Sequence, residues 1–267
     1  MSREGWPDMQ RDSIANTFTV ATCLCIVCSV VVSTAAVLLR PAQERNQAME
    51  QKRNILQAAG LYRPDQPLEE LFKQIEVQVV DLESGQLVDP SVIDPDTFNQ
   101  RAAARDPDLS RSLDSRQDPA GIGRREKYSF VYLVRKDGQL SQIVLPVRGR
   151  GLWSTLYGFL ALDADLDHIQ GLTFYEHGET PGLGGEVDNP RWKQQWVGKR
   201  AFDEEGNIRI RVLRGRVDQD DPAAIHQIDG LAGATITAQG VSNLVRFWLG
   251  EQGFGSVLET LRELESE

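Results

Sequence analysis

The chain has 267 residues, of which 40% are hydrophobic and 25% charged, a composition typical of folded proteins rather than of disordered or fibrous ones. It contains 29 basic and 39 acidic residues, and residues 40–267 alone carry a net charge of −9. Because an acidic surface repels phosphate backbones, the composition excludes nucleic acid as a favourable partner.

The first element is an uncharged apolar segment, Ile14 to Leu39, which follows a short polar tail of residues 1–13. A helix of these 26 residues would be roughly 39 Å long, enough to cross the hydrocarbon core of a bilayer. The segment is longer than the apolar region of a signal peptide, and Arg40-Pro41 is not a small-residue cleavage site. We therefore predict an uncleaved single transmembrane helix over residues 14–39. Basic residues are slightly more numerous after this helix than before it, which favours a cytoplasmic domain, but long domains are translocated largely regardless of charge.

The apolar segment contains all three cysteines of the chain, Cys23, Cys25 and Cys28. Closely spaced thiolates can hold an iron–sulfur cluster, but such a cluster normally needs four ligands. Cysteine is also a small apolar residue that suits a helix interior. We interpret the three as ordinary helix residues, and a metal site shared with a partner's cysteines is the alternative.

A second helix is predicted over the polar segment that follows, where Ile55 and Leu56 are among the few apolar residues and Gly60 and Pro64 end the pattern. We expect residues 40–66 to form a membrane-proximal helix and linker that separates the bilayer from one large domain, residues 67–267.

The domain is predicted to begin with a β-branched, alternating strand at residues 75–82. The next segment, about 89–125, contains four prolines and many charges, which predicts an irregular, mostly exposed insertion. Strand patterns follow at residues 128–135, 140–147, 157–162, 169–175 and 208–213, and Lys136-Asp137-Gly138 is a hairpin turn between the first two of these.

Three helices are expected among and after these strands, at residues 190–196, from 236 towards Gly250, and at 256–264. The second of them has apolar residues at helical spacing: Val241, Leu244, Val245, Trp248 and Leu249. Strands and helices do not alternate regularly. The predicted class is therefore α+β, with a mixed or antiparallel sheet and packed helices.

Several common sites are absent from the sequence. It contains no Gly-x-Gly-x-x-Gly after a strand, no Walker loop and no Gly-x-Ser-x-Gly elbow, so the chain has no NAD site of its own and no sign of hydrolase chemistry. The three histidines are too scattered for a zinc site, and the acidic pairs at 204–205 and 220–221 are typical of solvated turns. No catalytic residue and no metal ligand is predicted.

A glycine-rich stretch, residues 175–186, directly follows a predicted strand. Gly182, Gly184 and Gly185 allow backbone angles that other residues avoid and would let a planar ligand approach the main chain, while Glu179 and Thr180 can supply polar contacts. The alternative is a long surface turn.

A second stretch of small residues, 229–237, opens the helix that begins near Ile236. Free N–H groups and the helix dipole favour an anion such as a phosphate at this point. The alternative is a plain helix start in which Thr235 or Thr237 caps the N-terminus. Arg214 and Arg216 follow a strand and could approach such a phosphate, although arginines at strand ends are usually solvated.

These two stretches carry a resemblance to a known family. The motif Asp229-x-x-Ala232-Gly233-Ala234-Thr235 resembles the flavinylation motif of FMN-binding domains, in which the last threonine carries FMN through a phosphoester. Residues 179–184 resemble the loop that lies against the flavin. Together with Gly151-Leu152-Trp153-Ser154, residues 157–161, Asn189-Pro190 and the single anchor, they make the chain similar to the C subunits of sodium-translocating NADH:quinone reductases. Ala232 departs from the family pattern, which usually has Ser or Thr there.

The resemblance implies covalent FMN on Thr235, with a cofactor site formed by Asp229, Gly233, Ala234, Thr237, Trp153, Glu179, Thr180, Gly182, Leu183 and Gly184. In this interpretation Trp153 and Leu183 make apolar contacts with the ring system, and Glu179 and Thr180 make polar contacts that tune its potential. Two alternatives remain: Trp153 as a core aromatic, and Thr237 as either a helix-end residue or the competing acceptor hydroxyl.

The resemblance also implies a function. The chain would be an electron-transfer subunit of a complex that oxidises NADH, reduces ubiquinone and exports sodium, with its domain on the periplasmic side of a bacterial inner membrane. Its partners would be the other subunits, a flavin-transferring maturation enzyme and the lipid bilayer, and the isolated chain would show no turnover. One alternative is the corresponding FMN subunit of the Rnf-type ion-translocating ferredoxin:NAD oxidoreductases. Another is a flavin-free anchored binding domain in which Thr235 only caps a helix.

Overall fold

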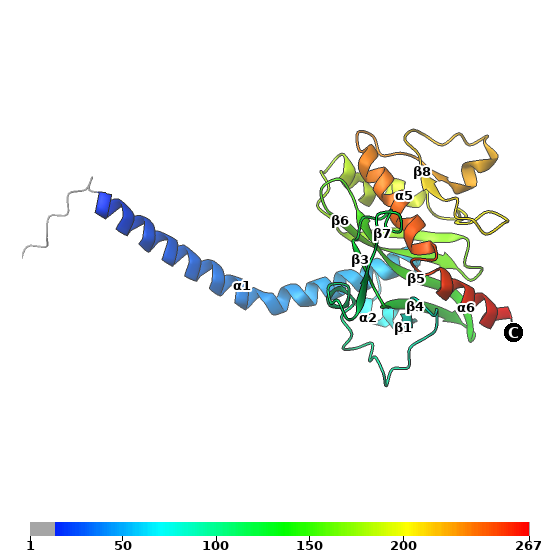
Figure 1. Cartoon of the computed structure of the whole chain (residues 1–267), viewed down its shortest axis with the longest axis horizontal. Helices are drawn as coiled ribbons and strands as arrows, with labels where there is room; N and C mark the ends of the chain where they lie inside the picture. Colours follow the sequence, from blue (N-terminus) through cyan, green and yellow to red (C-terminus); the bar gives the residue numbers. More distant parts are fainter. Residues whose placement is uncertain (1–13, 267) are drawn as a thin grey trace, which may run out of the picture. The chain divides into compact units, whose positions relative to one another are not determined.

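The structure is a computed structural model that describes residues 14–266 (Figure 1). The polar tail expected at residues 1–13 lies outside these described residues. The chain divides between Met49 and Glu50 into two compact units. Helix α1, Ile14–Ala58, contributes to both units, so the two helices expected in this region are one continuous helix that includes Pro41.

The first unit carries the apolar part of α1. The large side chains between Ile14 and Leu39 are exposed, and so are the three cysteines. Within residues 14–266, α1 is the one helix long and apolar enough to cross a membrane, and its most apolar window has a mean hydropathy of 2.5. Exposed apolar surface on this scale favours transfer from water into an apolar environment.

The second unit is built on a five-stranded antiparallel sheet. Its strands are, in spatial order, β1 (Ile75–Asp81), β4 (Tyr128–Lys136), β5 (Gln139–Arg150), β6 (Thr155–Asp163) and β7 (Ile169–Glu176). The predicted turn between β4 and β5 is confirmed, because Lys136 pairs with Gln139 and leaves a two-residue loop. Asp137 and Gly138 in this loop have φ angles of 54° and 85°, as a type I′ turn requires.

The sheet is buried on both faces, because alternate residues of its central strands enter two different cores. In β5, Ile143 and Leu145 belong to the larger core, whereas Val144 between them belongs to the smaller one. Helices α5 (Thr235–Leu249) and α6 (Gly255–Ser266) contribute to the larger core, and α5 packs on β5 (Figure 1). The apolar residues of α5 that were expected from their spacing are all buried there.

The smaller core includes the last turns of α1. Ile55 and Leu56 are buried in it, and the hydroxyl of Thr173 on β7 donates to the carbonyl of Asn54 at 3.1 Å. The structure therefore differs from the spacer expected over residues 40–66. The second half of that segment is part of the domain, because its few apolar side chains pack on the sheet.

Short elements complete the second unit. They are α2 (Leu68–Phe72), η1 (Gly184–Asp188), α4 (Pro190–Gln194), η2 (Pro222–His226), β8 (Arg211–Val212) and β9 (Gln227–Ile228). The strand expected over 208–213 is shorter than predicted, since only β8 pairs with β9 and Ile208 forms an isolated bridge with Phe202. The β8–β9 pair is parallel and the large sheet antiparallel, so the predicted α+β fold is confirmed.

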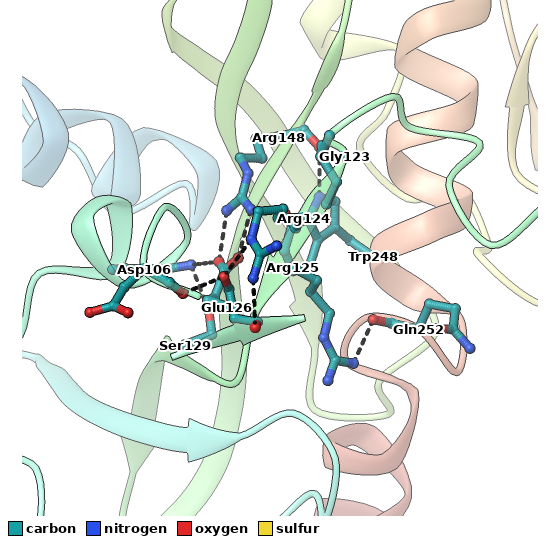
Figure 2. A network of polar contacts seen from close by, with 12 residues as sticks. Asp106, Gly123, Arg124, Arg125, Glu126, Ser129, Arg148, Trp248 and Gln252 are labelled. Atoms are coloured by element: carbon teal, nitrogen blue, oxygen red, sulfur yellow. Dashed lines mark hydrogen bonds and ion pairs between the residues drawn. The ribbon is translucent and has the colours of Figure 1, made fainter. Parts of the chain in front are cut away.

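The segment 89–125 is mostly exposed and largely irregular, as predicted, but it is attached more firmly than expected. It contains α3 (Gln100–Ala103), β2 (Ser110–Ser112) and β3 (Arg124–Glu126), and long-range polar contacts attach it to the rest of the domain. Figure 2 shows the buried Glu126 carboxylate, which pairs with Arg148 of β5 at 2.7 Å. Arg125 donates to the carbonyl of Gln252, just before α6, at 2.7 Å. The end of the insertion is thereby held against β5 and the loop before α6.

Candidate functional site

The N-terminus of α5 is not capped by a side chain. Ala234 is the N-cap residue, and Thr235, the first residue of the helix, is exposed. Thr237 is completely buried, and its hydroxyl donates to Oε2 of Glu179 at 2.5 Å. The alternative in which Thr235 or Thr237 caps the helix is therefore wrong. Of the two threonine hydroxyls, that of Thr235 is the accessible one.

Glu179 connects three segments of the site. Its Oε1 accepts hydrogen bonds from the amides of Trp153 and Ser154 at 2.9 and 3.2 Å, and its Oε2 accepts one from the amide of Leu152 at 3.2 Å in addition to the bond from Thr237. Burial opposes ionisation of this carboxyl, but the four hydrogen bonds outweigh burial and hold its pKa below the ordinary value. The carboxylate thus joins the 151–154 loop, the 179–184 loop and the start of α5.

Glycine is needed where the chain passes this carboxylate. A Cβ on Gly151 would lie 2.5 Å from Oε1 of Glu179, and one on Gly184 would lie 2.7 Å from Oε2 of Glu179 and from the hydroxyl of Thr237. In the predicted trio of Gly182, Gly184 and Gly185, only Gly182 has a positive φ, 76°. The glycine-rich pattern therefore reflects close packing around Glu179 as well as backbone freedom.

Four large apolar side chains are exposed at the site. Trp153 is 69%, Ile236 59%, Leu183 44% and Leu152 40% exposed. The interpretation of Trp153 as a core aromatic is wrong, because most of its side chain is exposed. Leu183 lies over Gly233, where an added Cβ would be 2.9 Å from its Cδ2. Sequence analysis missed Ile236, although an isoleucine beside an exposed helix start was a usable signal.

An open pocket of about 480 Å³ lies beside Thr235. Its lining comes from the end of the insertion, the end of β5 and the loop after it, the segment after β8, and the first turns of α5: Pro119, Ala120, Gly121, Arg150, Gly151, Leu152, Arg214, Thr235, Ile236, Gln239, Gly240 and Asn243. A volume of this size is in the range of cofactor sites. Arg214 was a candidate from the sequence, whereas Arg150 and the end of the insertion were missed because they are distant along the chain.

Asp229, the first residue of the motif, makes hydrogen bonds to other parts of the domain. Its Oδ1 accepts from the amide of Val217 at 2.7 Å, and its carbonyl accepts from the indole of Trp192 at 2.8 Å. Its amide donates to the side chain of Gln195 at 3.0 Å. Asp229 does not line the pocket; it holds the motif against the segment after β8 and against α4.

Known proteins share the segments that form this site. The family model for the FMN-binding domain matches residues 151–250, which include the loop around Trp153, the Glu179 segment and the start of α5. The C subunit of the Na(+)-translocating NADH-quinone reductase from Pseudomonas aeruginosa is 50% identical over 260 residues, which cover 96% of this chain and 99% of that protein. The chain belongs to this family of C subunits. Its counterpart from Yersinia pestis is 47% identical, and the match covers 94% of each chain.

Solved structures of the same family have the same fold. The crystal structure of NqrC from Shewanella oneidensis superposes with a TM-score of 0.74 at 34% identity, covering 83% of this chain and 99% of that one. The structure of the family member from Parabacteroides distasonis gives a TM-score of 0.63 at 26% identity, covering 82% and 96%. The predicted family and fold class are confirmed, and membership of the quinone-reductase family is favoured over the ferredoxin-linked alternative.

Proposed function

We propose that this chain is the electron-carrying C subunit of a sodium-translocating NADH:quinone reductase, with FMN joined to Thr235 through a phosphoester. The observation that supports the attachment site is the contrast between two hydroxyls. That of Thr235 is exposed beside an open pocket at an uncapped helix N-terminus, whereas that of Thr237 is buried and bonded to Glu179.

The start of α5 suits the phosphate of such a cofactor. In the attachment step the maturation enzyme would supply the flavin as a phosphoanhydride. Oγ of Thr235 forms a P–O bond and loses its proton, the P–O bond of the anhydride breaks, and the other phosphate-bearing half leaves with that electron pair. The product keeps one negative charge, which the free amides and the dipole of α5 stabilise. Because Thr235 is exposed, a separate flavin-transferring maturation enzyme can reach it.

The exposed apolar side chains suit the ring system. Trp153, Leu183 and Ile236 surround the start of α5 and would hold the flavin at the domain surface, with the exposed Thr180 in reach of its polar edge. Glu179 and Thr237 would act one layer below, by fixing the loops that carry these contacts. FMN supplies reversible electron uptake, and a ring at the surface is accessible to partners that donate and accept electrons.

The other subunits of the complex would supply the remaining chemistry. The relatives are named as subunits of an NADH-quinone reductase that translocates sodium, and the sequence of this chain contains no Gly-x-Gly-x-x-Gly motif for a dinucleotide. We assign NADH oxidation, ubiquinone reduction and sodium export to the assembled complex and expect no turnover from the isolated chain. Residues 14–39 would anchor it in the bacterial inner membrane, with the domain on the periplasmic side.

The attachment is tested on the full chain made in its native host. After denaturing electrophoresis, ultraviolet light should reveal a flavin band that Thr235→Ala abolishes and Thr237→Ala retains. Both threonines lie in the tryptic peptide Val217–Arg246, so fragment masses assign the cofactor and its site together. A wild-type peptide without added mass would favour the flavin-free binding domain instead.

A further inference from the structure

Arg150 is held firmly at the edge of the pocket. Its amide donates to the carbonyl of Ala120 at 2.7 Å, and α5 packs so closely on its backbone that a Cβ on Gly240 would lie 2.4 Å from its carbonyl oxygen. Its aliphatic stem lies beside Gly121, where an added Cβ would be 3.1 Å from the Cβ of Arg150. The backbone and the stem are therefore placed by two segments, the end of the insertion and α5.

Arg214 is placed by the flavinylation motif itself. The amide of Leu213 donates to the carbonyl of Ile228 at 2.8 Å, and the amide of Gly230 donates to the carbonyl of Gly215 at 2.7 Å. Two residues farther on, Val217 is bonded to the side chain of Asp229. This explains how Asp229 can matter for the site without lining it: it fixes the segment that presents Arg214.

Within residues 14–266, both guanidinium groups lack a protein counter-ion. Among the described residues, neither Arg150 nor Arg214 makes a side-chain hydrogen bond or an ion pair, and the pocket lining includes no acidic residue. Residues 40–267 carry a net charge of −9, yet this pocket gathers two exposed, unpaired arginines around an exposed threonine. An anionic ligand would supply the missing partner.

We propose that Arg150 and Arg214 form a two-arginine clamp that binds the phosphate of the flavin nucleotide at Thr235. The inference rests on the proposed function, since esterification would keep the phosphate next to Oγ of Thr235 whatever the ring orientation. Guanidinium groups present planar, permanently charged donors that match phosphate oxygens, and the α5 amides complete the anion site. The clamp orients the phosphate during attachment and holds the phosphodiester afterwards.

The test uses the full chain produced in its native host. Samples are taken before flavin attachment is complete, so that its rate can be compared between variants. Arg150→Gln, Arg214→Gln and the double variant are compared with Arg216→Gln, an exposed arginine two residues away that does not line the pocket. Intact mass gives the fraction of chains that carry flavin. We expect about a tenfold slower attachment for each clamp variant, as for loss of one hydrogen bond to a charged group, and no change for Arg216→Gln.

Phosphorus NMR of the modified fraction reports on the phosphate directly. The clamp predicts a changed phosphodiester shift in Arg150→Gln and Arg214→Gln, and a smaller change in Arg150→Lys and Arg214→Lys, which keep the charge but lose the planar fork. The lysine variants serve for both readouts if a glutamine variant does not fold. If the variants attach flavin at the wild-type rate and give the wild-type phosphorus shift, the clamp is overturned, although Thr235 is still modified. An unmodified wild-type chain overturns the proposed function instead.

Discussion

Thr235 and Thr237 are two positions apart in α5, yet their hydroxyls lie in opposite environments. Each residue of an α-helix is rotated by about 100° from the one before, so residues two apart point to nearly opposite sides. Thr235 consequently lines the open pocket, and Thr237 reaches the carboxylate of Glu179. The small-residue stretch 229–237 contains both hydroxyls, and only their burial separates a candidate acceptor from a packing residue.

At the residue scale, the first prediction concerns the contribution of the buried Glu179 carboxylate to stability. We expect Glu179→Gln to lower the free energy of unfolding by about 2 kcal/mol at pH 7, because a neutral amide cannot accept four hydrogen bonds and its NH₂ group would face donors. Urea unfolding of the unmodified protein measures the difference. Glu205→Gln, on an exposed turn, is the control and should be neutral.

The pKa of Glu179 makes this stabilisation depend on pH. Since its folded-state pKa is lowered, the contribution is complete above the unfolded-state pKa of about 4.3 and is lost as the pH falls through the folded value. The advantage of wild type over Glu179→Gln should therefore shrink below about pH 4. An advantage that persists unchanged at about pH 3 would contradict the role of the charge.

At the scale of elements, the contact between α5 and the end of β5 sets the position of Thr235 relative to Arg150. Gly240→Ala adds a methyl group 2.4 Å from the carbonyl oxygen of Arg150. Alanine improves helix propensity by about 1 kcal/mol, but such overpacking costs roughly 1–3 kcal/mol and moves Thr235 relative to Arg150. We expect lower stability in urea and slower flavin attachment.

The control for the stability measurement is Gln239→Ala, at the exposed neighbouring position of the same helix. Because Gln239 lines the pocket, this variant is not a control for flavin attachment. It exchanges an exposed side-chain bond to Asn243 for a higher helix propensity, and its stability in urea should be close to that of wild type. Equal stability of Gly240→Ala and wild type would show that α5 can shift without cost.

Elements were predictable where their causes are local. The β4–β5 hairpin follows from alternating apolar residues and from Asp137-Gly138 in the turn. The exposed, irregular character of the insertion 89–125 was predicted, but its attachment was missed because its anchors are distant in sequence: Arg125 bonds to Gln252, 127 positions farther on. Prolines and charges predict an exposed loop. No local pattern indicates that such a loop has a distant hydrogen-bond partner.

At the scale of the whole molecule, the division at Met49 predicts the result of truncation. A chain that begins at Glu50 should fold and stay soluble, because the second unit keeps both cores. A chain that begins at Gly60 loses Ile55 and Leu56 from the smaller core. Each such loss costs roughly 2–5 kcal/mol, against about 5–15 kcal/mol for a whole domain, so this chain should melt at a much lower temperature or aggregate.

Thermal unfolding followed by circular dichroism compares the two chains, with a start at Arg40 as the control. The Arg40 chain should melt like the Glu50 chain, since the added residues belong to the other unit. Identical melting of the Gly60 chain would mean that the end of α1 does not stabilise the domain.

The sequence by itself determined the apolar N-terminal helix, the α+β class, most strands and the motif around Thr235, because these depend on composition and on patterns within short windows. The tertiary structure decided which threonine is accessible, that Glu179 holds loops together, and that Arg150 and Arg214 share one pocket with Thr235. Those features arise from residues up to about a hundred positions apart that packing brings together, and no local pattern of residues specifies such contacts.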